Sequence, residues 1–244
     1  MVENYIALDD IQRFRSPVDF VSWFSQKLDK INSGENVREQ ILLRRGIAKL
    51  VFEEVYPLYR LLQIRGSQWN QIHFRNVDGN QNFDVETTSE LQAVPRFIEI
   101  TVADNNYEEH LRMRYFADHG GVSTIGKVSH EGTRRTGLKV YVGMEARLHA
   151  KINREKELLI KEAVDQKSSK NYANDTGLMI YFDDYVAFND PEDAELMSNF
   201  IVSLGDDWME TFSHLFVVGA TGSKVWTRKR GEQGVELNAL ASRE

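Results

Sequence analysis

The sequence predicts an α/β fold whose central mixed sheet is flanked by helices. Apolar residues recur at helical spacing over 17–33 and again over 35–62. The short run 97–102 is nearly continuously apolar, which is typical of a central strand buried on both faces. A charged helical segment, 145–169, is followed by the apolar run 178–182. A helix before such a strand indicates a crossover connection between parallel strands.

Two helices are predicted at the N-terminal side. Ser16 is a helix cap followed by a proline in the first turn, and Gly34 ends this first helix. The second helix runs over 35–62 and contains Pro57 within its apolar stripe. Because proline lacks an N–H group and its ring contacts the preceding turn, we expect a kink or a break near Tyr56.

Strands and a second set of helices follow. Alternating residues predict strands near 69–77 and 82–87, which precede the central strand at 97–102. The segment 107–119 is predicted as a short helix, and 125–142 as a hairpin. The long helix over 35–62 is therefore followed by three strands in the predicted order.

A single domain over 1–244 is expected, with a core at about 40–185. The N-terminal helix 17–33 and a C-terminal helix plus hairpin over 190–228 are expected to pack on that core as additions. The tail, 231–244, has little pattern, and we expect it to be loosely held.

Composition limits the classes of function. The chain of 244 residues has no Cys, which excludes disulfides, thiol catalysis and cysteine zinc sites and suits a reducing compartment. Its first residues lack the pattern of a signal peptide, and no window has the roughly 20 apolar residues of a membrane span. We therefore expect a cytoplasmic protein with no membrane partner. The net charge of −7 counts against broad nucleic-acid binding but allows a local basic groove.

Two acidic residues lie where neighbouring strands are predicted. Side chains alternate along a strand, so Glu99 and Thr101 share one face, and Ile100 points to the other. If the strands pair, the carboxylates of Asp84 and Glu99 converge. Two such carboxylates repel unless a proton or a cation lies between them, and Mg²⁺ or Mn²⁺ prefers oxygen ligands. The sequence thus predicts a divalent metal site with these two acids.

These residues resemble the motif of the PD-(D/E)XK nuclease superfamily, which includes the restriction endonucleases. The resemblance covers roughly 40–185 and implies a restriction-endonuclease-like core: a helix, three strands, a crossover helix and a further strand. Asp84 matches the metal-binding Asp that opens the motif, although Phe83 replaces its Pro. Glu99 matches the second acidic ligand.

The sequence departs from that motif at Thr101, where the family most often has a Lys. In the family this Lys helps to activate water or to stabilise the transition state. Three lysines are candidate substitutes: Lys167 and Lys170, late in the crossover helix, and Lys49.

The resemblance also implies further metal ligands. Family members often place a Glu on the first core helix, and Glu54 fits best, with Glu53 as the alternative. The main-chain carbonyl of Ile100 matches another ligand. The implied cofactor is Mg²⁺ or Mn²⁺, and the implied activity is hydrolysis of a phosphodiester bond.

A basic segment lies outside the motif. It contains Lys127, Arg134, Arg135 and Lys139 against one Glu131. A basic hairpin can contact phosphates without reading bases. The alternative is a solvated hairpin tip, since charged residues are mostly exposed.

Three functions remain open from the sequence. The first is a Mg²⁺-dependent endonuclease that acts on DNA rather than RNA, compatible with a homodimer because many relatives cut two strands as dimers. The second is a catalytically inactive protein of the same fold that binds nucleic acid or protein. The third is an unrelated α/β protein whose carboxylates face water.

Overall fold

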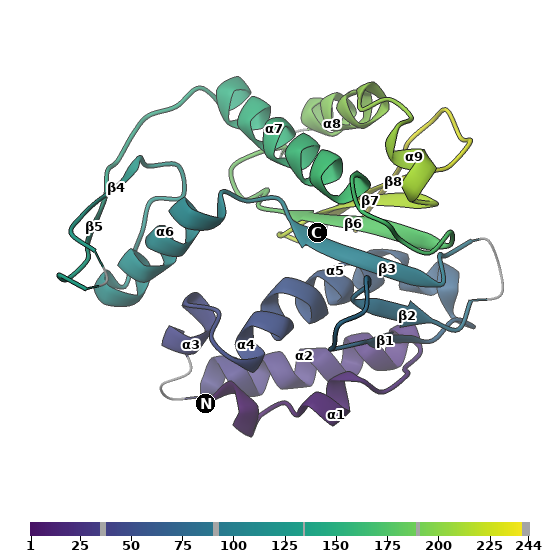
Figure 1. Cartoon of the computed structure of the whole chain (residues 1–244), viewed down its shortest axis with the longest axis horizontal. Helices are drawn as coiled ribbons and strands as arrows, with labels where there is room; N and C mark the ends of the chain where they lie inside the picture. Colours follow the sequence, from purple (N-terminus) through teal and green to yellow (C-terminus); the bar gives the residue numbers. More distant parts are fainter. Residues whose placement is uncertain (35–37, 90–92, 134, 189–190, 241–244) are drawn as a thin grey trace.

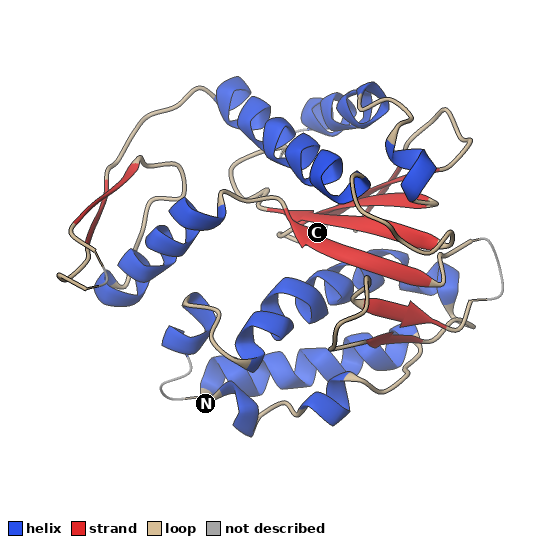
Figure 2. Cartoon of the chain, viewed as in Figure 1, coloured by secondary structure: helices blue, strands red, loops and turns tan. Residues whose placement is uncertain are grey.

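A seven-stranded mixed sheet with helices on both faces forms the body of the protein (Figures 1 and 2). The computed structural model describes residues 1–34, 38–89, 93–133, 135–188 and 191–240. The strands lie in the order β1-β2-β3-β6-β7-β8-β9. Their bounds are Phe74–Asn76 (β1), Val85–Thr87 (β2), Phe97–Val102 (β3), Thr176–Phe182 (β6), His214–Gly219 (β7), Lys224–Lys229 (β8) and Glu236–Ala239 (β9).

The central strands β3, β6 and β7 are parallel, and the other neighbours in the sheet are antiparallel. The helix α7, His149–Ser168, connects β3 to β6 as the predicted crossover. Both faces of a parallel strand are covered by helices, so β6 and β7 are apolar along almost their whole length. The predicted α/β class with a mixed sheet is therefore confirmed.

One face of the sheet is covered by the N-terminal helical layer. This layer contains η1 (Val2–Asn4), α1 (Leu8–Ile11), α2 (Pro17–Ser33), α3 (Arg38–Leu42), α4 (Ile47–Leu50), the π-helical turn η2 (Val51–Val55), α5 (Tyr56–Arg65) and η3 (Gly66–Trp69). Ser16 caps α2 by accepting the Asp19 N–H at 3.2 Å, which satisfies an orphan donor of the first turn. Phe24 and Leu58 pack in this layer against Ile98 and Ile100 of the sheet.

The other face is covered by α7, α8 (Pro191–Ser203) and α9 (Trp208–Thr211). Leu178 and Ile180 of β6 pack here, whereas Met179 packs in the N-terminal layer. The same alternation applies to β3, where Ile98 and Ile100 face the N-terminal layer. Glu99, paired with Leu178, therefore faces α7.

The predicted helix over 35–62 is not continuous, which corrects the sequence prediction. Within the described residues α3 ends at Leu42 and α4 begins at Ile47. Between them Arg44 has φ 46° and Gly46 has φ 56°, a left-handed backbone that a helix cannot continue through. Near Tyr56 a π-helical turn gives way to α-helix, which accommodates Pro57 without a backbone donor.

The C-terminal segment extends the sheet, and this also corrects the prediction. The hairpin of β7 and β8 is not an addition packed on the core, because β7 pairs in parallel with β6. Residues 236–239 of the tail form the edge strand β9 on β8. The tail was expected to be loose because it has no alternating pattern, but backbone pairing needs none. Residues 241–244 lie outside the described part of the chain.

An arm stands apart from the sheet, at the left of Figure 1. It consists of α6 (Asn106–His119) and a two-stranded sheet of β4 (Val128–Glu131) and β5 (Lys139–Val142). Gly120 ends α6 in the left-handed conformation, with φ 79°. The predicted helix and hairpin are confirmed here. The arm is inserted between β3 and α7.

Candidate functional site

The hydrogen-bond ladder between β2 and β3 is short, and Asp84 continues it with its side chain. Val85 pairs with Ile98 and Glu86 pairs with Phe97. The Asp84 N–H donates to the Ile98 carbonyl at 2.9 Å. Asp84 Oδ2 then accepts the N–H of Ile100 at 2.7 Å. The carboxylate therefore lies where the two strands separate.

Glu99 meets a lysine from the crossover helix. The Lys167 ammonium donates to Glu99 Oε1, and both side chains are mostly buried, with exposed fractions of 16% and 11%. Burial, and after it the negative charge of Glu99, raises the pKa of Tyr172, which lies just after α7. Removing one partner of a buried ion pair such as Lys167 and Glu99 is costly, because it leaves the other charge uncompensated.

Of the three candidate substitute lysines, Lys167 is the one that the structure brings to the acidic pair. Lys49 lies 4.0 Å from Glu53 in the N-terminal layer, and Lys170 is exposed beyond the end of α7. Thr101 lies on the face that α7 covers, because it follows Glu99 by two residues. A lysine on α7 therefore reaches the same space as a lysine at position 101.

Asp84 lies close enough to Glu99 for the charge of Glu99 to disturb its protonation. Burial, and after it the negative charge of Glu99, raises the pKa of Asp84 to about 7. The Ile100 N–H and the charge of Lys167 oppose this rise. Negative charge at Asp84 is thus incompletely compensated.

Glu54 lies on the π-helical turn η2, across the cavity from α7. Burial raises its pKa to about 8, followed by the charges of Asp84, Asp78, Glu53 and Glu99. Glu54, Ile100, Thr101 and Lys167 line a cavity of about 480 Å³. The predicted acidic residue of the first core helix therefore faces the space between the helical layers.

The residues present fit a hard divalent cation by chemistry, with one limit. Asp84, Glu99 and the Ile100 carbonyl offer oxygen donors, and their surplus negative charge favours a cation. In the described residues, however, no group of three or more His, Asp or Glu could hold a metal ion together. Glu54 therefore does not complete a group of three carboxylate ligands with Asp84 and Glu99. The fit therefore rests on Asp84 and Glu99.

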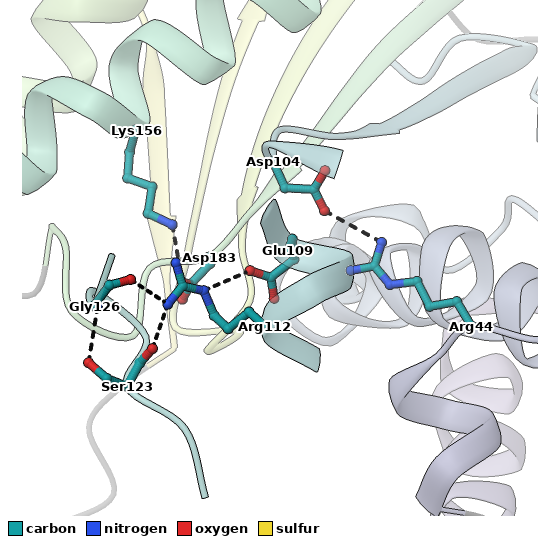
Figure 3. A network of polar contacts seen from close by, with 8 residues as sticks. All are labelled: Arg44, Asp104, Glu109, Arg112, Ser123, Gly126, Lys156 and Asp183. Carbon is teal, nitrogen blue, oxygen red and sulfur yellow. Dashed lines mark hydrogen bonds and ion pairs between the residues drawn. The ribbon is translucent and has the colours of Figure 1, made fainter. Parts of the chain in front are cut away.

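The cavity continues toward the arm past residues that the sequence did not single out. A second cavity, of about 370 Å³, shares Arg44 and Asp104 with the first. Figure 3 shows Arg44 donating to Asp104, at 3.5 Å, and Lys156 paired with Asp183 at 3.1 Å. Arg44 also contacts Glu53 at 3.2 Å. Sequence reasoning missed Arg44 because its position depends on a left-handed backbone that no local pattern predicts.

The predicted nucleic-acid-binding residues lie on the arm and do not line the cavity around Glu54 and Lys167. Lys127, Arg135 and Lys139 are exposed, and none of the three has an ion pair in the described part of the chain. Arg134 lies outside the described residues. The acidic cavity and the basic hairpin are thus separate features.

The raised pKa values predict how the stability of the metal-free protein depends on pH. Folded Asp84 and Glu54 keep protons that the unfolded chain releases at its lower pKa, so their contribution is complete below about pH 4 and is lost by about pH 8. The free energy of unfolding should fall as the pH rises through this window. Urea denaturation of the wild type and of an Asp84→Asn, Glu54→Gln double variant measures it. Equal slopes of the unfolding free energy against pH in the two proteins would contradict the assignment of the raised pKa values to Asp84 and Glu54.

Among the described residues, no helix is both long and apolar enough to cross a membrane. Comparison with family models, with curated proteins and with solved structures gave no match to the chain.

Proposed function

We propose that this protein is a metal-dependent nuclease with a PD-(D/E)XK-type core, which hydrolyses phosphodiester bonds in DNA rather than RNA. One observation carries the proposal: the Lys167 ammonium bonds to Glu99 beside Asp84, where β2 and β3 separate. A lysine and two acids are the residue types of the family's motif. Here the lysine comes from the crossover helix, which accounts for Thr101.

The topology supports the same proposal. The order of elements in the family's core is a helix, three strands, a helix and a further strand. In this chain α5 precedes β1, β2 and β3, and α7 then leads to β6, which pairs with β3 in parallel. Fold likeness alone does not imply activity, so the site residues carry the functional part.

The residues have separate roles in the proposed reaction. Asp84, Glu99 and the Ile100 carbonyl would hold Mg²⁺ or Mn²⁺. When bound, such an ion polarises a phosphate oxygen and lowers the pKa of water. Lys167 supplies a fixed positive charge beside Glu99, which stabilises negative charge developing on the phosphate. Burial of these groups strengthens that electrostatic stabilisation.

A second candidate function is a catalytically inactive binding module of the same fold. Two observations favour it. The described residues contain no three-membered carboxylate group for a metal, and Lys167 compensates the charge of Glu99 without a cation. In that case Asp84 serves to extend the ladder of β3 and has no chemical role.

Cleavage of plasmid and single-stranded DNA with Mg²⁺, Mn²⁺ or a chelator distinguishes the two. The nuclease proposal predicts cleavage with either ion and none with the chelator. It also predicts that Mn²⁺ raises the melting temperature, by roughly 2–4 °C where the ion stabilises the fold by about 1 kcal/mol. Metal-independent cleavage, or neither cleavage nor stabilisation, would contradict the proposal.

A further inference from the structure

The hairpin of the arm has a charge opposite to that of the rest of the protein. Residues 127–139 contain four basic residues and one acidic residue, whereas the whole chain has a net charge of −7. Lys127 and Lys139 are exposed and have no ion pair in the described residues. Exposed lysines attract a polyanion, because lysines that neutralise phosphates release the cations condensed on the nucleic acid.

The register of the hairpin places an aromatic ring between these lysines. Ser129 pairs with Tyr141, and Glu131 pairs with Lys139. Residues directly opposite in an antiparallel pair share a face, and so do residues two apart in one strand. Tyr141, Lys139 and Lys127 therefore lie on one face of the ribbon, which we call the outer face.

The opposite face of the ribbon is turned toward α6. His130 of that face contacts the Tyr107 hydroxyl at 3.0 Å, and Val128 is buried. The outer face is thus free of α6. Tyr141 is 46% exposed there, and its hydroxyl donates to Glu131 at 3.3 Å, which holds the ring in place on the ribbon.

The arm is held at its base by a buried arginine, shown in Figure 3. Arg112 of α6 is 9% exposed and donates to the carbonyls of Ser123 and Gly126, at 2.6 and 2.9 Å. It also pairs with Glu109 at 3.4 Å. These contacts join the segment before β4 to α6, so the ribbon and the helix form one preorganised unit. Preorganisation lowers the entropy cost of binding.

We propose that the outer face of the hairpin, formed by Lys127, Lys139 and Tyr141, binds single-stranded nucleic acid, with a base stacked on Tyr141 and phosphates on the lysines. Cations that follow the backbone together with an aromatic ring for the bases are what single strands require. A duplex hides its base faces, so Tyr141 selects against it. The proposal rests on the proposed function, because the arm is inserted between β3 and α7, which carry Glu99 and Lys167.

Fluorescence anisotropy of the full chain, without metal, tests this with labelled single strands of about 20 nucleotides and the matching duplex. The single strand should bind more tightly than the duplex. Tyr141→Ala should weaken single-strand binding about fivefold or more, as expected for loss of one stacked base. Lys127→Ala and Lys139→Ala should each make the slope of log K against log salt concentration shallower, by about 0.7 for each lost phosphate contact.

Matched controls come from the same molecule. Tyr107→Ala removes a 56% exposed tyrosine of the same arm on its other side, and Lys30→Ala removes an exposed lysine of α2; both should bind as wild type does. Comparison of labelled DNA and RNA single strands shows which sugar the outer face prefers, and tight binding of either strand supports the inference.

Three outcomes would overturn the inference: a duplex that binds as tightly as the single strand, no effect of Tyr141→Ala, or an equal effect of Tyr107→Ala. The proposed function fails separately. If Tyr141→Ala loses single-strand binding while the chain cleaves nothing with any metal, the single-strand inference stands and the nuclease proposal does not. If Tyr141→Ala binds single strands as the wild type does and cleavage still requires Asp84, the nuclease proposal stands and the single-strand inference does not.

Discussion

Replacing either acid of the central pair is expected to abolish metal-dependent cleavage. Asp84→Asn and Glu99→Gln each remove one negative charge and keep the shape of the side chain. Loss of several kcal/mol of charge stabilisation corresponds to a fall in kcat of about 10³-fold or more. The fold should survive Asp84→Asn, because the amide oxygen still accepts the Ile100 N–H. Rates of plasmid cleavage with Mg²⁺ measure the effect, and melting temperatures measure folding.

Glu86→Gln is the matched control for these variants. Glu86 lies two residues after Asp84, on the same face, and it pairs with Arg75 at 2.5 Å away from the cavity. Removing this charge should leave cleavage unchanged. Full cleavage by both Asp84→Asn and Glu99→Gln would rule out the metal site, as would an equal loss in Glu86→Gln.

Loss of the lysine on the crossover helix is expected to have the second-largest effect. Lys167→Met removes the charge beside Glu99 and should lower kcat by about 10²–10⁴-fold, the usual range for a positioned charged or proton-transferring group. The variant leaves Glu99 buried without its partner, so the melting temperature of the metal-free protein should also fall. The melting temperature must therefore be measured together with the cleavage rate.

A second substitution separates catalysis from stability. Thr101→Lys places a lysine two residues after Glu99 on the same face of β3. In the Lys167→Met background it should restore cleavage by about tenfold or more over Lys167→Met alone. Lys170→Met is the control, since Lys170 is exposed beyond α7. Wild-type rates in Lys167→Met, or a loss in Lys170→Met as large as in Lys167→Met, would contradict the role of Lys167.

Much of the fold could be predicted because its elements have strong local signals. The cap at Ser16, the apolar run of β3 and the helix before β6 each follow from spacing alone. The break at Arg44 and Gly46 could not be predicted, because it depends on backbone angles that tertiary contacts impose. The edge strand β9 was missed for a related reason: backbone pairing, not side-chain alternation, forms it.

The candidate site was predictable in part for the same kind of reason. Alternation along a strand predicts that Glu99 and Thr101 share a face, and the position of Asp84 at the start of β2 follows from strand pairing. The contact of Lys167 depends on how α7 lies over the sheet, so the sequence favours Lys167 but leaves Lys170 and Lys49 as alternatives. Whether Glu54 forms one group with Asp84 and Glu99 depends on how η2 packs against β3, which no pattern in the sequence encodes.

The most direct test of the central claim is the anomalous scattering of a crystal of the full chain soaked in Mn²⁺. We expect one strong peak bound by a carboxylate oxygen of Asp84 and one of Glu99, at about 2.0–2.6 Å, as oxygen ligands of hard cations require. The Lys167 ammonium should then lie beside the ion and no longer be the main partner of Glu99. No peak between these two acids at saturating Mn²⁺, with the bond from Lys167 to Glu99 intact, would contradict the account.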